Sequence, residues 1–152
     1  MDQRPSQDFQ PGLPALLRAA RKTYGSAIRK ALAKADYDDI PKNGIFVLSA
    51  INRSGAPLAE IIDALGVSKQ SAGQLVDALV LRGYLDRCVD DADRRRLTIT
   101  LSERGLEAAK ITGAVVDRID RALVKKVGRE KIAHTRETLL ALFALGHEGE
   151  QP

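Results

Sequence analysis

The first pattern in the chain is a series of apolar residues at intervals of three and four, from Leu13 to Leu32, with basic residues between them. This spacing predicts a long amphipathic helix. Pro41 suits the first position of a second helix, in which Ile45 and Ile51 continue the same spacing. Gly44 is expected to weaken that helix by about 1 kcal/mol relative to alanine.

Two short helices are predicted next. Apolar side chains between Leu58 and Leu65 mark the first, which Gly66 closes. Ser68 is a suitable N-cap for the second, whose apolar face repeats until "RGY" ends the helix at Gly83. Two short helices joined by a glycine turn are typical of a helix-turn-helix.

An alternation with a period of two follows the helix-turn-helix. Leu85, Arg87 and Val89 alternate with other side chains, "DDADRR" forms a charged turn, and the apolar residues of 97–101 alternate again. This pattern predicts a β-hairpin with a charged tip. A helix-turn-helix followed by a hairpin is a winged helix.

The last third of the chain predicts two more helices. Ser102 caps the first, which carries an apolar stripe from Leu106 to Val127 and is broken by Gly128. The second has apolar positions over 132–145 and is expected to end near Gly146. The predicted fold class is therefore mainly α with a small β-hairpin wing (α+β).

Composition narrows the class of protein. A chain of 152 residues with 44% hydrophobic and 29% charged side chains suits one helix-rich globular domain, expected to span 1–152. No apolar run is long enough to cross a bilayer and the start of the chain lacks a signal peptide, so we expect a cytoplasmic protein without a membrane partner. A lone Cys88 and the distant His134 and His147 predict no disulfide, no metal site and no cofactor.

Net charge says little about partners. The formal charge is +4, yet residues 53–104, which hold the predicted winged helix, contain as many acidic as basic side chains. DNA binding, if it occurs, must therefore depend on the local placement of arginines and helix ends.

The chain resembles the MarR family of winged helix-turn-helix transcriptional regulators in two segments, "DALGVSKQSAGQLVDALVLRGYL" (63–85) and "DRRRLTITLSERG" (93–105). The resemblance spans about 13–145. It implies a homodimer with dimerisation helices at 10–35 and 105–147 and a DNA-binding region at 38–102. Long terminal helices with apolar stripes also favour a partner chain, although a monomeric bundle is an alternative.

The second helix of the helix-turn-helix predicts a DNA-facing surface. At about 100° per residue, its polar side chains lie opposite its apolar stripe, and glutamine can make two hydrogen bonds to adenine. Its start favours phosphate through exposed N–H groups. The candidate DNA-binding residues here are Ser68, Lys69, Gln70, Ser71, Gly73 and Gln74. An ordinary solvated helix face is the alternative.

The hairpin tip matches the D-x-R wing motif of the family. The match implies that Asp93 holds the wing or its arginine, that Arg95 enters the minor groove, and that Arg94 and Arg96 contact phosphates. The family often has arginine where Gln74 stands and a hydroxyl residue at Gly73, so we expect this chain to depend more on its wing. A self-neutralising charged turn is the alternative.

The family also implies a pocket for a small aromatic or phenolic effector. Arg21, Tyr24, Tyr37 and Phe46 could line it, since they combine aromatic surface with a cation. Aromatic residues at helical spacing are more often part of a core. Cys88 does not match the reactive cysteine of peroxide-sensing relatives and is expected to be a buried or half-buried filler.

The sequence contains no glycine-rich phosphate loop, nucleophile elbow or metal triad, so no enzyme is expected. The predicted function is a ligand-responsive, sequence-specific repressor that binds double-stranded DNA as a homodimer. The alternative is a winged-helix module for protein–protein contact without specific DNA binding.

Overall fold

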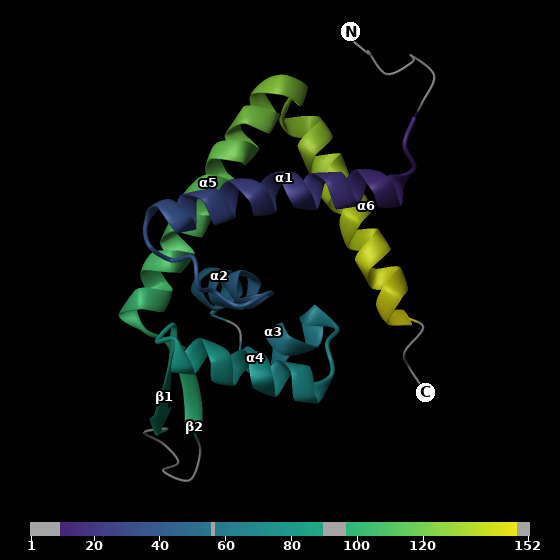
Figure 1. The fold of residues 1–152 in the computed structure, drawn as a ribbon. Coiled ribbons are helices and arrows are strands. Elements are labelled where there is room, and N and C mark those ends of the chain that lie inside the picture. Colours follow the sequence, from purple (N-terminus) through teal and green to yellow (C-terminus); the bar gives the residue numbers. More distant parts are fainter. Residues whose placement is uncertain (1–9, 56, 90–96, 149–152) are drawn as a thin grey trace, which may run out of the picture. The chain divides into compact units, whose positions relative to one another are not determined.

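The computed structural model describes residues 10–55, 57–89 and 97–148. In chain order the elements are α1 (Leu13–Lys34), α2 (Gly44–Ser54), α3 (Leu58–Leu65), α4 (Lys69–Leu81), β1 (Leu85–Val89), β2 (Leu97–Leu101), α5 (Glu103–Val127) and α6 (Arg129–Glu148) (Figure 1). The chain divides into two compact units, Met1–Val115 and Val116–Pro152, and the division falls within α5. The predicted class, mainly helical with one antiparallel hairpin, is confirmed.

The core of the first unit is built from apolar side chains of its helices and of the start of β1. Its most deeply buried large side chains are Leu32, Val47, Leu48, Leu79, Tyr84 and Leu85. Helix α2 packs against α3 and β2, and α4 packs against β1. Burial of this kind, at roughly 25 cal/mol per Å² of apolar surface, is the main term that holds a winged domain together.

The start of α2 differs from the prediction. Pro41 is not the first helical residue, because the helix begins at Gly44 after Asn43 adopts a left-handed conformation with φ 66°. The Pro41 carbonyl instead accepts a turn hydrogen bond from the Gly44 N–H at 2.8 Å. A Cβ on Gly44 would lie 2.9 Å from Ile40 Cγ2 and 3.0 Å from Leu79 Cδ2. Glycine is therefore needed here for close packing at the helix start, rather than weakening a helix interior.

The helix-turn-helix forms as the capping residues predict. Helix α3 ends at Gly66, whose φ of 63° is the left-handed conformation that favours glycine. The Ser68 hydroxyl then accepts a hydrogen bond from the Ser71 N–H at 3.1 Å and caps α4. Helix α4 buries Ala72, Leu75 and Leu79 and so is fixed to the core by one face only.

The wing hairpin pairs in the predicted antiparallel sense, with Leu85 opposite Leu101 and Val89 opposite Leu97. Only Leu85 is buried in β1, and Val89 is 55% exposed. The prediction that Cys88 is a buried or half-buried filler is wrong: its side chain is exposed. The physical reason is that a two-stranded hairpin extending from the core leaves its outer residues uncovered. Cys88 Sγ lies 3.6 Å from the Thr100 hydroxyl on the neighbouring strand.

The two C-terminal helices also follow the sequence pattern. The Ser102 hydroxyl accepts a hydrogen bond from the Gly105 N–H at 3.0 Å, which confirms the predicted cap of α5. The chain turns at Gly128, where φ is 90°, and α6 continues to Glu148, slightly past the expected end at Gly146. Several leucines of α6 are exposed.

Candidate nucleic-acid interface

The outer face of α4 carries the predicted DNA-binding side chains. Lys69, Gln70, Ser71, Gly73 and Gln74 are all exposed, whereas the opposite face of the helix is buried. A polar helix face of this kind can enter a major groove, where side-chain amides read base edges. The structure thus confirms the predicted orientation of the face, and contact with DNA stays a prediction.

The N-terminal turn of α4 is ordered by hydrogen bonds between two serines. Ser68 holds the Ser71 N–H, and the Ser71 hydroxyl accepts a hydrogen bond from the Ser68 hydroxyl at 3.0 Å. Lys69 adds a charge beside the positive end of the helix dipole. At Gly73 a Cβ would meet nothing within 4 Å, so the backbone is open on that side.

The structure adds an ion pair that sequence reasoning missed. The Arg87 guanidinium on β1 donates to the carboxylate of Asp77 on α4. Both side chains are exposed, so salt screens the pair and its contribution to stability is at most about 1 kcal/mol. Its geometric effect is to join β1 to the outer face of α4. The alternation of β1 put Arg87 on one face of the strand but could not identify its partner.

The wing tip lies outside the described residues. Asp93, Arg94, Arg95 and Arg96 all belong to this part of the chain. Their predicted DNA contacts therefore stay predictions. The described strands on either side of them, 85–89 and 97–101, supply the hairpin that the wing motif requires.

A second cluster, missed entirely at the sequence level, lies at the base of the wing. We define it as the Arg104 cluster, comprising Tyr37, Asp39, Tyr84 and Arg104. Arg104 Nη2 donates to Asp39 Oδ1 at 2.9 Å and to the Tyr84 hydroxyl oxygen at 3.0 Å, and the Tyr84 hydroxyl donates to Asp39 Oδ1. The Arg82 guanidinium donates to the Asp39 carbonyl. These residues come from the segment between α1 and α2, the turn between α4 and β1, and the start of α5.

Aromatic rings complete the Arg104 cluster. The Arg104 guanidinium carbon lies 4.7 Å from the centroid of the Tyr84 ring and 5.5 Å from that of the Tyr37 ring. The two ring centroids are 6.4 Å apart and the rings are tilted by 51°. Both cation–π contacts and the tilted ring pair are favourable arrangements.

Protonation equilibria reflect these contacts. The hydrogen bond from Tyr84, with help from Arg104, lowers the pKa of Asp39 below its ordinary value. Burial, followed by the hydrogen bond to Asp39, raises the pKa of Tyr84. The hydrogen bond to Tyr84 also raises the pKa of Arg104. At neutral pH the cluster therefore holds a carboxylate, a neutral phenol and a guanidinium.

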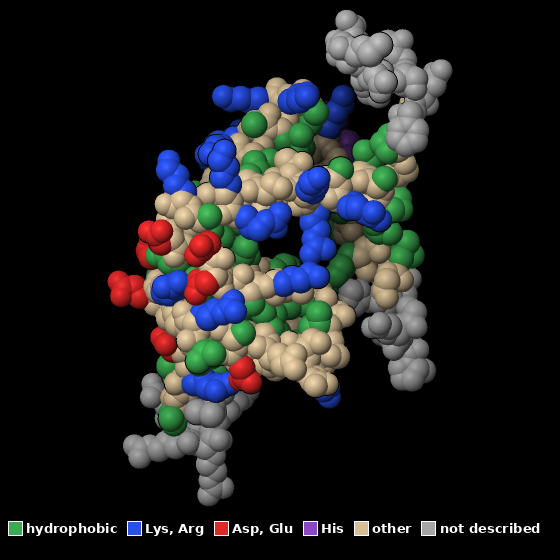
Figure 2. Space-filling model, viewed as in Figure 1, with side chains coloured by type: hydrophobic (Ala, Val, Ile, Leu, Met, Phe, Trp, Pro, Cys, Tyr) green, Lys and Arg blue, Asp and Glu red, His purple; other side chains and the backbone are tan. Residues whose placement is uncertain are grey.

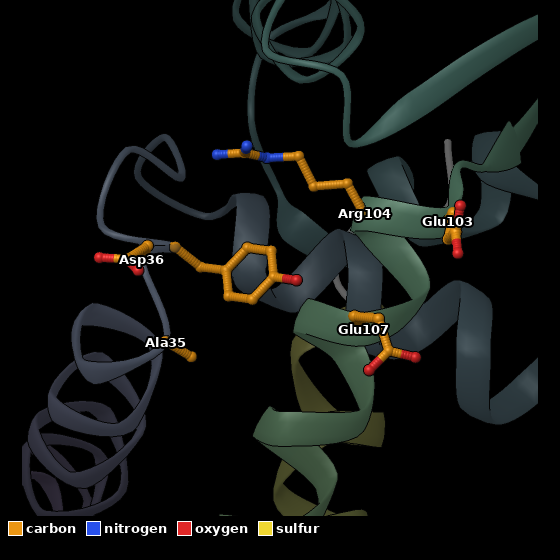
Figure 3. Close-up of a pocket in the computed structure, with 6 residues that line it drawn as sticks. Ala35, Asp36, Glu103, Arg104 and Glu107 are labelled. Carbon is orange, nitrogen blue, oxygen red and sulfur yellow. The ribbon is translucent and has the colours of Figure 1, made fainter.

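A shallow open pocket lies beside the Arg104 cluster. Its volume is about 420 Å³, and its lining residues are Ala35, Asp36, Tyr37, Glu103, Arg104 and Glu107. Figure 3 shows the Arg104 side chain extending away from Glu103 and Glu107. On the face drawn in Figure 2, acidic side chains gather over the end of α1 and the start of α5.

Of the four predicted effector residues, only Tyr37 lines this pocket. Arg21 is exposed on α1, Tyr24 is half-buried on the same helix, and Phe46 on α2 is 47% exposed. Their role in binding an effector stays a prediction. No sequence pattern linked Tyr37 to Arg104, because the two are far apart along the chain.

Within the part of the chain that the structure describes, no group of three or more His, Cys, Asp or Glu residues is placed to hold a metal ion. No described helix is both long enough and apolar enough to span a membrane.

Comparison with protein families assigns the segment that carries this interface. Residues 39–96, which include α2 to β1, match the model of the MarR family. Over this segment the chain is similar to the MarR family. The matched segment holds both α4 and the wing motif, so the MarR resemblance noted in the sequence is confirmed.

Solved MarR-type structures share the fold over nearly the whole chain. The Staphylococcus aureus MepR–DNA complex is similar with a TM-score of 0.68 and 19% identity, covering 89% of this chain and 98% of that one. NadR in complex with 4-hydroxyphenylacetate gives a TM-score of 0.68 and 21% identity, covering 91% and 97%. The reduced form of MarR from E. coli gives 0.63 and 20%, covering 89% and 98%. No curated protein sequence matches the chain.

Proposed function

We propose that this chain is a DNA-binding transcriptional regulator of the MarR type that acts as a homodimer on a pseudo-palindromic site. The observation that carries the proposal is the exposed polar face of α4, capped by Ser68 and flanked by an antiparallel hairpin, within the segment that matches the family. Two such heads would occupy successive major grooves, with half-sites about 10 bp apart.

Recognition by α4 would combine positioning and base contact. Lys69 and the first N–H groups of the helix would bind phosphate, and Gln70 and Gln74 would read base edges, with two hydrogen bonds each to adenine. The Ser71 hydroxyl would bind a phosphate, and Gly73 would let the backbone approach the groove, because a Cβ there would meet nothing within 4 Å.

The wing would supply the remaining contacts. Arg95 would enter the minor groove, Arg94 and Arg96 would bind phosphates, and Asp93 would orient its neighbours. Because α4 carries a single exposed lysine on this face, much of the salt-dependent affinity is expected to come from the wing.

Exposed leucines support the homodimer. On α6, Leu139, Leu140, Leu142 and Leu145 are between 37% and 66% exposed. Leu13 and Leu16, near the start of α1, are each 49% exposed. Apolar surface of this extent is normally covered, and a second copy of the chain is the simplest cover.

We further propose that a small aromatic effector releases the DNA. NadR, which shares the fold, binds 4-hydroxyphenylacetate. An effector that binds one dimer geometry better than another would change the spacing of the two α4 helices and weaken DNA binding by that difference. The proposed effector contacts are Arg21, Tyr24, Tyr37 and Phe46. We propose that the DNA-bound protein represses transcription.

Cellular location and the absence of catalysis follow from the same proposal. Members of the MarR family are transcription regulators. A regulator of this class acts where the chromosome is, which in a bacterial cell is the cytoplasm. We assign the chain no reaction of its own.

The decisive experiment is selection of bound sequences from a random duplex library, followed by fluorescence anisotropy at several salt concentrations. We expect a two-fold symmetric site and an affinity that falls steeply with salt. Arg95→Ala should weaken binding about tenfold. Arg118→Ala removes an equal charge from α5, outside the matched segment, and should leave binding unchanged.

The alternative, a winged-helix module for protein contact, predicts a different result. Such a module would select no sequence, and any weak DNA binding would respond equally to Arg95→Ala and Arg118→Ala. A chain that stays monomeric in sedimentation equilibrium at high concentration would refute the homodimer.

A further inference from the structure

The described part of the wing is fixed to the protein mainly at its base. In β1 only Leu85 is buried, and the four residues that follow are exposed. The Ser102 N–H donates to the Tyr84 carbonyl at 3.2 Å, where the hairpin leaves the core. An isolated two-stranded hairpin is only marginally stable, so its direction depends on its contacts with the rest of the protein, and those at this base are among them.

The Arg104 cluster joins both ends of the hairpin. Tyr84 directly precedes β1, and Arg104 lies three residues beyond the end of β2. The 3.0 Å hydrogen bond between them therefore links the two ends of the hairpin at its base. Asp39 accepts from both side chains and connects this closure to the segment that links α1 to α2.

The cluster controls direction more than it adds stability. The Arg104 and Asp39 side chains are 42% and 44% exposed, so solvent screens their ion pair. A planar guanidinium that is hydrogen-bonded to two acceptors and lies against two rings has, however, a nearly fixed orientation. Tyr84, which is fully buried, transmits that orientation to the first residue of β1.

A small tilt at the base has a large effect further out. The five residues of β1 span about 17 Å at a rise of ~3.4 Å per residue. A tilt of about 10° at Tyr84 would displace the far end of the strand by roughly 3 Å, which exceeds the tolerance of a hydrogen bond. The exposed Arg87–Asp77 pair holds the strand to α4 but does not connect it to the α1–α2 segment.

We infer that Arg104 is a positioning residue that sets the direction of the wing, and that Asp39 and Tyr37 couple this direction to the segment between α1 and α2. The part of the inference that is tested by DNA binding rests on the proposed function. The part that is tested by hydrogen exchange of the hairpin does not depend on it. Arg104 needs no contact with DNA for this role. It acts through Tyr84.

The test is a double-mutant cycle between Arg104→Gln and Arg95→Ala, measured by anisotropy on the selected site at a temperature where all variants are folded. In the natural background Arg95→Ala should weaken binding about tenfold. In the Arg104→Gln background the same change should cost less than about threefold, since a misdirected wing no longer delivers Arg95. Arg104→Lys, which keeps the charge, should restore part of the coupling.

Hydrogen exchange provides the readout that does not need DNA. Amides of β1 and β2 should exchange several-fold faster in Arg104→Gln, while those of α2 stay unchanged. The matched control is Lys110→Gln, which breaks an exposed ion pair with Glu107 on the same helix at 2.8 Å and should alter neither readout. Tyr84→Phe keeps the buried ring, removes both hydroxyl bonds, and serves as a second variant if Arg104→Gln folds poorly.

Two results would overturn the inference. One is an equal cost of Arg95→Ala in both backgrounds, and the other is unchanged hairpin exchange in both Arg104→Gln and Tyr84→Phe. If Arg95→Ala has no effect in the natural background, the proposed wing contact fails, and hairpin exchange alone then decides the role of Arg104.

Discussion

Gly105, at the start of α5, is the position where a single methyl group should most disturb the wing base. A Cβ built on Gly105 would lie 2.0 Å from the Tyr84 carbonyl oxygen and 3.2 Å from Leu101 Cδ2. The same carbonyl accepts the Ser102 N–H at 3.2 Å. Gly105→Ala therefore forces the backbone before β1 to retreat by roughly 1.4 Å to reach an ordinary contact.

The size of the effect can be worked out from three contributions. Overpacking against backbone costs roughly 1–3 kcal/mol, and loss of the Ser102 hydrogen bond costs about 1 kcal/mol more. Alanine recovers about 1 kcal/mol through its better helix propensity. The net loss is about 1–3 kcal/mol, or a fall in Tm of several degrees for a chain of this size.

Urea denaturation at one fixed protein concentration measures this loss without confusing it with dimer dissociation. Gly113→Ala is the matched control, because it lies in the same helix and its Cβ would meet nothing within 4 Å. The control should gain up to about 1 kcal/mol. If the two variants have equal stability, the close approach at Gly105 is not real and the description of the wing base is wrong.

Three further changes test other parts of the interface. Ser68→Ala removes the cap on the Ser71 N–H and should lower the free energy of unfolding by about 1 kcal/mol in urea, whereas Ser68→Asp should retain it. Gly73→Ala should raise that free energy by up to about 1 kcal/mol yet weaken DNA binding in anisotropy, and tighter binding would contradict a close backbone approach. Because the pKa of Asp39 is lowered, its carboxylate stabilises the fold above the usual carboxyl pKa of about 4, and this contribution is lost as the pH falls through the depressed value. The difference in Tm between the natural chain and Asp39→Asn should therefore be present at pH 7 and close toward pH 3, and a difference independent of pH would exclude the carboxylate as its source.

The helices and the hairpin were predictable because local signals determine them. Ser68 and Ser102 marked helix starts, and Gly66 and Gly128 marked helix ends, through capping chemistry that depends on neighbouring residues alone. The start of α2 was predicted wrongly. Whether Pro41 begins a helix depended on the left-handed Asn43 and on the space that Gly44 leaves for Leu79, and that space is a tertiary property.

The candidate site likewise has a part that could be predicted from the sequence and a part that could not. The outward face of α4 follows from helical periodicity, so its polar residues were found from the sequence. Cys88 was misplaced because a strand pattern does not reveal whether anything covers the strand. The Arg104 cluster joins residues 20 and 65 positions apart, a separation at which no local pattern operates.

The tyrosines at the wing base have a practical consequence. The chain contains no tryptophan and three tyrosines, so its near-ultraviolet emission comes from phenol rings alone. Tyr37 and Tyr84 both lie within reach of the Arg104 guanidinium, and a hydrogen bond to a carboxylate changes the brightness of a phenol. The unlabelled protein thus has an intrinsic optical reporter of wing movement, readable in a stopped-flow cuvette as an operator duplex or a phenolic compound is added.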